Sequence, residues 1–132
     1  MSHCSGLVKL ISFKSITLDM AQFKEPIFLE RLLNRALAWY SRKKIYRPFV
    51  EKLQLNGDEQ VLEFGSGMGI SAKLIASKLS RAGGKITCVD LSKKWMKMLK
   101  KYTKNCTNVK TYQGKLGEVN LPKNRFDLVF FH

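Results

Sequence analysis

The stretch that most limits the fold of this chain is residues 61–69, VLEFGSGMG, where a short apolar run is followed by three glycines in five positions. Residues 60–64 have the length and apolar content of a buried strand. Glycines directly after such a strand permit a tight turn, a close approach of ligand to backbone, and free N–H groups at the start of the next helix. The stretch therefore predicts a strand, a ligand-binding turn and a helix that begins near Met68.

Strand and helix patterns alternate through the rest of the chain. This order is typical of an α/β fold with a parallel sheet and right-handed crossover connections. The nearly continuous apolar run DLVFF near the end indicates a strand that is covered on both faces. The later elements are expected as a strand at 86–90, a helix from 93 to about 104, and strands at 108–113 and 126–132.

The N-terminal part has a different pattern. Residues 1–55 are predicted to form an N-terminal helical segment, and residues 56–132 an α/β domain. Residues 1 to about 24 are weakly patterned and are expected to form a short helix and an extended segment. Apolar residues recur at helical spacing from Pro26, and Pro48 is expected to open a second short helix.

The spacing of the glycines bears on the kind of ligand. In a dinucleotide fingerprint the third glycine comes one position later, where Ile70 stands in this chain. Glu63, near the end of the strand, would repel the anionic pyrophosphate of a dinucleotide, but it would attract an ammonium group. Both features favour a ligand with an amino acid end, and an NAD-dependent oxidoreductase is the less favoured alternative.

Asp90 ends the next strand, about 20 residues beyond the glycines. Its two carboxylate oxygens can accept hydrogen bonds from the vicinal hydroxyls of a ribose. The other interpretation, that Asp90 caps the following helix, is weaker because Ser92 is better placed as the cap. We therefore expect Asp90 to bind the ribose of a nucleotide ligand.

Taken together, these motifs resemble the class I S-adenosylmethionine-dependent methyltransferases, especially the branch that includes the ubiquinone and menaquinone biosynthesis enzymes. VLEFGSGMG resembles their first motif, ITCVDLS the second, NVKTYQG the third strand and RFDLVFF the fourth strand, over about residues 45–132. The resemblance implies S-adenosylmethionine as the cofactor. It also implies a Rossmann-like sheet in the order 3-2-1-4, with the last three of the usual seven strands absent from this chain.

The resemblance assigns roles to individual residues. The glycine loop would surround the methionine part of the cofactor, the acid before it would hold the ammonium group directly or through water, and the acid after the second strand would bind the ribose. Two leucines would sandwich the adenine. The implied cofactor-binding residues are Glu63, Gly65, Ser66, Gly67, Gly69, Asp90, Leu91 and Leu116.

One position departs from the family pattern. GKL at 114–116 stands where the family commonly has GDA, whose acid accepts a hydrogen bond from the adenine amino group. Lys115 cannot accept that hydrogen bond. We therefore expect weaker cofactor binding than in relatives that keep the acid.

The charge balance would attract anions. The chain has 24 Lys and Arg residues against 10 Asp and Glu, for a net charge of +14. A plain solvated face is the favoured interpretation of the Lys-rich helix at 93–104, and a surface for an anionic partner is the alternative. The spacing of its larger side chains predicts that they pack on the sheet instead of stacking on bases: Trp95, Met98, Leu99 and Tyr102.

The end of the chain raises a separate expectation. A strand at 126–132 would leave an apolar edge unpaired, which predicts a dimer, a partner or a missing C-terminal half there. His132 is a candidate general base, although a terminal histidine is more often incidental.

Composition sets further limits. No apolar run is long enough to span a bilayer and no secretory signal is present, so we expect a cytoplasmic protein. Cys4, Cys88 and Cys106 contain no close pair, so neither a disulfide framework nor a zinc site is expected.

The sequence therefore predicts an S-adenosylmethionine-dependent methyltransferase that acts on a small-molecule acceptor. An RNA acceptor is a less favoured alternative. A hypothesis of another class is a non-catalytic nucleotide-binding remnant, or a fragment that needs a partner or a missing half.

Overall fold

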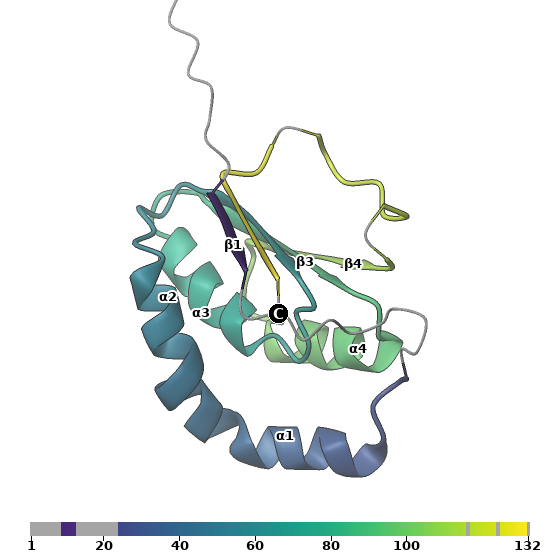
Figure 1. The fold of residues 1–132 in the computed structure, drawn as a ribbon. Helices are drawn as coiled ribbons and strands as arrows, with labels where there is room; N and C mark the ends of the chain where they lie inside the picture. The colour runs from purple at the N-terminus through teal and green to yellow at the C-terminus, as the bar shows by residue number, and fades with distance from the viewer. Residues whose placement is uncertain (1–8, 13–23, 116, 124, 132) are drawn as a thin grey trace, which may run out of the picture.

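The computed structural model describes residues 9–12, 24–115, 117–123 and 125–131. Their strands form one parallel sheet in the order β1-β5-β2-β3-β4 (Figure 1). Read from the far edge, β4-β3-β2-β5 is the predicted order 3-2-1-4, so the predicted Rossmann-like fold class is confirmed. The strands are β1 (Lys9–Ser12), β2 (Gln60–Phe64), β3 (Lys85–Asp90), β4 (Val109–Gln113) and β5 (Leu128–Phe131).

The helices before and between these strands cover one face of the sheet (Figure 1). A π-helical stretch joins the two N-terminal helices, so the two helices expected there run on without a break. The helix after the glycines begins two residues later than expected, because Gly69 is left-handed with φ 86° and ends the turn. The helices are α1 (Phe28–Ser41), η2 (Arg42–Tyr46), α2 (Arg47–Lys52), α3 (Ile70–Leu79) and α4 (Lys93–Tyr102).

Both faces of the central strands are buried. Side chains alternate along β2, so that Val61 packs under the helices while Leu62 and Phe64 pack on the other face. That second face is covered by apolar side chains from the long connection between β4 and β5, among them Val119 and Phe126. In β5, the strand for which this covering was predicted, Leu128 and Phe130 are buried under the helices, and Val129 and Phe131 are half-buried against the other face.

The outer edge of β5 is paired, so the prediction of an unpaired edge at 126–132 is wrong. Lys9–Ser12 lies parallel to Leu128–Phe131, from Lys9 opposite Leu128 to Ser12 opposite Phe131. Figure 1 shows the purple and yellow strands, from opposite ends of the sequence, side by side. A strand from the same chain takes the hydrogen-bonding groups that a partner was expected to take. The proposed division between residues 1–55 and 56–132 stays a prediction.

Helix α4 is rotated relative to the prediction. The residues that it buries are Met96 and Leu99, at 3% and 0% exposed. Trp95, Met98 and Tyr102 are only half-buried, so the expectation that both aromatic residues lie in the core is wrong. Basic residues lie next to apolar ones at both borders of the apolar stripe. Spacing alone therefore does not determine which of the apolar residues face the sheet.

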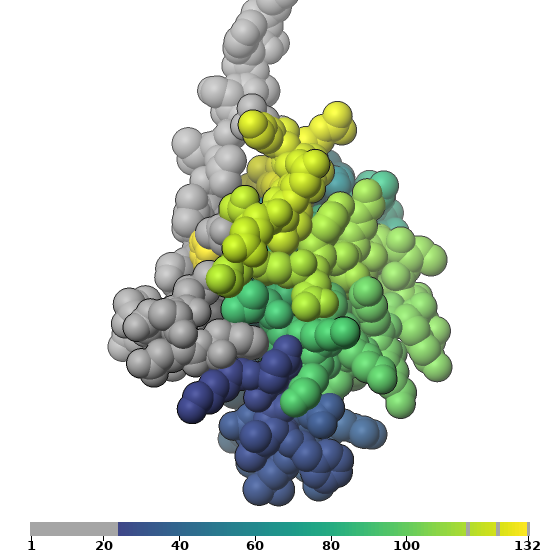
Figure 2. All heavy atoms as spheres, turned by 90° about the vertical axis from the view of Figure 1, so that its right-hand side faces the viewer, coloured from purple at the N-terminus to yellow at the C-terminus, as the bar shows by residue number. Residues whose placement is uncertain are grey.

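Helix α1 has an apolar stripe that the sequence predicts, but no side chain of this helix is buried. Phe28 and Trp39 are both 71% exposed. Figure 2 shows the dark blue residues of α1 and of the segment directly before it at one end of the molecule. Within the described ranges no helix is long and apolar enough to cross a membrane. The expected cytoplasmic location stays a prediction.

Candidate cofactor site

The two sequence motifs meet at the carboxyl edge of the sheet. β2 and β3 are parallel neighbours with Phe64 opposite Val89, so the glycine turn after β2 lies beside the residues that follow β3. The Gly65 N–H donates to the Val89 carbonyl at 2.9 Å. The Gly67 N–H donates to Oδ2 of Asp90 at 2.8 Å. The structure therefore brings the predicted glycine loop and the predicted ribose-binding carboxylate into direct contact.

Asp90 is 7% exposed and is held at both oxygens. Its Oδ1 accepts from the Ser92 N–H at 2.8 Å, in addition to the contact with Gly67 at Oδ2. Burial raises the pKa of this carboxyl, the two backbone hydrogen bonds lower it, and the charges of Glu25 and Glu63 raise it again. Because a carboxylate has about four lone-pair positions, each oxygen keeps room for a further donor. Ribose binding by Asp90 stays a prediction.

Two glycines of the loop differ in their surroundings. Gly67 (φ 51°) and Gly69 (φ 86°) both adopt the left-handed conformation that glycine tolerates best. A Cβ on Gly67 would meet no atom within 4 Å, whereas a Cβ on Gly69 would lie 2.8 Å from Cγ of Leu99. Gly67 thus borders open space that a ligand can fill. Gly69 lets the loop pack closely against α4.

Glu63 lies beneath the loop. It is 0% exposed and shares the helix-covered face of β2 with Val61. The Ser71 hydroxyl donates to its Oε1, and the Cys88 thiol lies 3.7 Å from its Oε2. Burial, foremost, and the charge of Glu63 raise the pKa of Cys88 well above its usual range, so Cys88 stays a thiol. A contact between Glu63 and the ammonium group of a ligand stays a prediction.

The other predicted site residues are placed as follows. Ser66 is buried in the turn, and its hydroxyl donates to the Glu63 carbonyl at 3.2 Å. Leu91 is half-buried directly after β3. Lys115 is exposed, with its Nζ 3.9 Å from Oε1 of Glu118. Leu116 and His132 lie outside the described residues, so their predicted roles stay predictions.

Glu25 is a part of this edge that sequence reasoning missed. Its Oε2 accepts from the Ser92 hydroxyl at 2.6 Å, and its Oε1 accepts from the Lys93 N–H at 2.8 Å. Ser92 itself caps α4 as predicted, because its Oγ accepts from the Trp95 N–H at 3.0 Å. Glu25 is 67 positions from Ser92 in the sequence, so no local pattern could have identified it.

Replacing Glu25 with glutamine is expected to destabilise the protein in a pH-dependent way. The Ser92 hydroxyl, foremost, and the N–H groups of Lys93 and Lys94 lower the pKa of Glu25. Because the folded-state pKa is below the unfolded value, the ionised group stabilises the fold above the unfolded pKa. That contribution is lost as the pH falls through the folded pKa. Urea unfolding of both proteins from neutral to acidic pH measures it, and a stability difference that does not change with pH would contradict this account.

The electrostatics of the edge favour a ligand with a positive centre. The charges of Glu25 and Glu63 both act on Asp90, which itself contacts the glycine loop. Carboxylates beside the loop would repel a pyrophosphate but attract a sulfonium or an ammonium group. The residues present therefore fit a methionine-bearing nucleotide better than a dinucleotide.

Comparison with known proteins agrees with this fit. Residues 61–132 match the sequence profile of a family described as methyltransferase domain. An rRNA adenine N-6-methyltransferase of Bacillus licheniformis is 29% identical over 87 residues, which make up 66% of this chain and 29% of that protein. The chain thus spans less than a third of the length of this curated relative.

Solved structures share the fold. An S-adenosylmethionine-dependent methyltransferase from Aquifex aeolicus superposes with a TM-score of 0.64 at 18% identity, covering 76% of this chain and 55% of that one. Phosphoethanolamine N-methyltransferase 1 of Haemonchus contortus, solved with phosphoethanolamine and S-adenosylhomocysteine, superposes with a TM-score of 0.62 at 14% identity, covering 74% and 21%. The profile match extends over more than half of the chain. The chain therefore belongs to the methyltransferase-domain family.

Proposed function

We propose that this chain is the cofactor-binding part of an S-adenosylmethionine-dependent methyltransferase. The observation that carries the proposal is the hydrogen bond from the Gly67 N–H to Asp90. It holds a carboxylate with free acceptor positions beside a loop that borders open space. This combination suits a ligand whose ribose lies at Asp90 and whose methionine part lies along the loop.

The residues at the carboxyl edge of the sheet would bind different parts of the cofactor. Asp90 would accept hydrogen bonds from the ribose hydroxyls, and the loop at Gly67 would leave room for the ligand against its backbone. The carboxylates of Glu25 and Glu63 would add to the negative potential that draws in a cationic ligand. Bound S-adenosylmethionine supplies a methyl group on a sulfonium. What the protein must then supply is an acceptor atom held in line and close to that methyl group.

The acceptor is the less constrained part of the proposal. A small molecule is the acceptor class that the sequence motifs favour, and the superposed phosphoethanolamine N-methyltransferase supports it by analogy of fold. RNA is a second candidate, supported by the similarity of the chain to rRNA adenine N-6-methyltransferases of Bacillus. Phosphoethanolamine and bacterial rRNA are therefore suitable test acceptors.

Methyl transfer can be measured with S-adenosylmethionine labelled in its methyl group. We expect ultraviolet irradiation to crosslink the label to the protein, and unlabelled S-adenosylhomocysteine, unlike NAD, to compete for that crosslink. Label that appears in phosphoethanolamine or in RNA identifies the acceptor class. Competed crosslinking without transfer would favour the non-catalytic remnant. No competed crosslink at all would contradict the proposal.

A further inference from the structure

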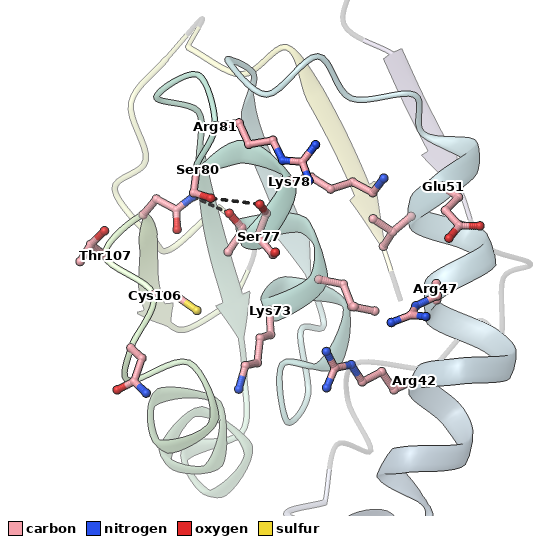
Figure 3. Close-up of a pocket in the computed structure, with 15 residues that line it drawn as sticks. Arg42, Arg47, Glu51, Lys73, Ser77, Lys78, Ser80, Arg81, Cys106 and Thr107 are labelled. Atoms are coloured by element: carbon pink, nitrogen blue, oxygen red, sulfur yellow. Dashed lines mark hydrogen bonds between the residues drawn. The ribbon is translucent and has the colours of Figure 1, made fainter.

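A hollow on the helix-covered side of the molecule has five cationic side chains and one carboxylate in its lining. It has a volume of about 540 Å³ and lies between α2, α3 and the segment that follows α4. Figure 3 shows these basic side chains reaching the hollow from η2, α2, α3 and the turn after α3. Glu51 is the carboxylate among its lining residues. The cations are Arg42, Arg47, Lys73, Lys78 and Arg81.

A second hollow, of about 560 Å³, lies between α1 and α4. It shares the lining residues Lys73 and Asn105 with the first hollow, so the two hollows are neighbours. No acidic residue of the described chain lines it. Its further cations are Arg31, Arg35, Lys94, Lys97, Lys101 and Lys104. We call the two neighbouring hollows together the basic trough.

Cations gathered in a concave surface repel one another and raise the local concentration of anions. Among these cations, Arg31 gives the most direct sign that a ligand is needed. Its Nε is buried and has no hydrogen-bond partner among the described residues. A buried donor without a partner costs free energy, and a guanidinium is the group best suited to a phosphate. The trough is therefore suited to a ligand that carries several negative charges.

Aromatic rings lie among these cations. The ring of Tyr102 lines the second hollow, with Nζ of Lys73 4.5 Å from its centroid. Phe28 lines the same hollow, with Cζ of Arg31 5.9 Å from its ring centroid. A basic groove interleaved with aromatic rings is the arrangement that holds single-stranded nucleic acid, because phosphates pair with the cations and bases stack on the rings.

We propose that the basic trough binds a single strand of RNA. Two neighbouring basic hollows suit a flexible chain with regularly spaced charges better than one isolated phosphate. Their concave shape does not match the flat surface of a bilayer. The neutral lining residues Ser77, Asn105 and Thr107 carry hydroxyl and amide groups that can bond the 2′-hydroxyl of RNA, which DNA lacks.

The test compares two variants with the same loss of charge. The trough variant carries Arg42→Gln, Lys73→Gln and Lys101→Gln, and the control carries Lys85→Gln, Lys110→Gln and Lys123→Gln, all exposed and outside the trough. Fluorescence anisotropy of a labelled oligouridine measures the Kd over a range of salt concentrations. We expect the trough variant to bind at least about tenfold more weakly. The slope of log Kd against log salt concentration should fall by about 2, because each phosphate that the protein no longer neutralises lowers the slope by about 0.7.

Several results would overturn the proposal. Equal weakening in the two variants would show that net charge alone drives binding. Equal affinity for DNA of the matching sequence would refute the assignment to RNA. Binding to phosphatidylserine vesicles without binding to RNA would assign the surface to a membrane. Circular dichroism of both variants controls for folding. The assay contains no cofactor, so its failure is separate from a failure of the proposed methyltransferase function.

Discussion

Replacing Asp90 with alanine is expected to weaken the binding of S-adenosylhomocysteine by at least about 100-fold, as measured by titration calorimetry. The substitution removes two hydrogen bonds from the ligand to a charged acceptor, each worth about 1.5–3 kcal/mol. It also takes away the acceptor of the Gly67 and Ser92 N–H groups. We expect a loss of about 1–2 kcal/mol in the free energy of unfolding, because relief of the buried charge offsets part of the cost.

Two further variants separate binding from stability at this position. Asp90→Asn keeps the shape and one acceptor oxygen, so its effects should fall between those of the wild type and of alanine. Asp58→Ala removes an exposed aspartate that precedes β2, at the opposite edge of the sheet from Gly67 and Asp90, and should leave the affinity unchanged. If Asp90→Ala unfolds more easily but binds the ligand as well as the wild type, Asp90 holds the loop and does not bind the cofactor.

Alanine substitutions at Gly69 and Gly67 are expected to have opposite main effects. Both place a Cβ in the left-handed region, at a cost of about 1–2 kcal/mol each. At Gly69 the new methyl group also lies 2.8 Å from Cγ of Leu99, so overpacking adds about 1–3 kcal/mol to the loss of stability. At Gly67 the methyl group enters open space, so stability falls less but affinity for S-adenosylhomocysteine falls by about tenfold.

Urea unfolding and calorimetry on the two variants measure these effects, and a third substitution provides the control. In a Leu99→Ala background the close Cγ and the Cδ1 atom are removed, and the Cβ that remains, at 3.4 Å, is at ordinary contact distance. The extra cost of Gly69→Ala over Gly67→Ala should therefore disappear in that background. If Gly67→Ala were the more destabilising change, or if the extra cost persisted, the packing role of Gly69 would be wrong.

The sequence identifies the elements whose signals are local. Glycines after a short apolar run place β2, the turn and α3, and Ser92 marks the start of α4 because capping depends on residues only three apart. The contact between Gly67 and Asp90 also follows, because neighbouring parallel strands bring their carboxyl ends together. The order of the four central strands came from the resemblance to a known family, not from periodicity.

The features that the sequence did not predict depend on contacts between distant segments. β1 has only four residues, and it is positioned by its pairing with β5, which lies at the other end of the chain. Glu25 reaches the start of α4 across the fold. The burial of Glu63 follows from the alternation of side chains along β2, which places it with Val61 under the helices. The motif predicts that Glu63 lies near the end of the strand, but it does not predict the direction of its side chain.

The central claim is that the carboxyl edge at Gly67 and Asp90 binds S-adenosylmethionine and not a dinucleotide. Titration of S-adenosylhomocysteine and, separately, of NAD into the wild-type protein in a calorimeter tests it most directly. We predict saturable binding of S-adenosylhomocysteine at one site per chain and no heat of binding with NAD at the same concentrations. Saturable heat with NAD and none with S-adenosylhomocysteine would contradict the account.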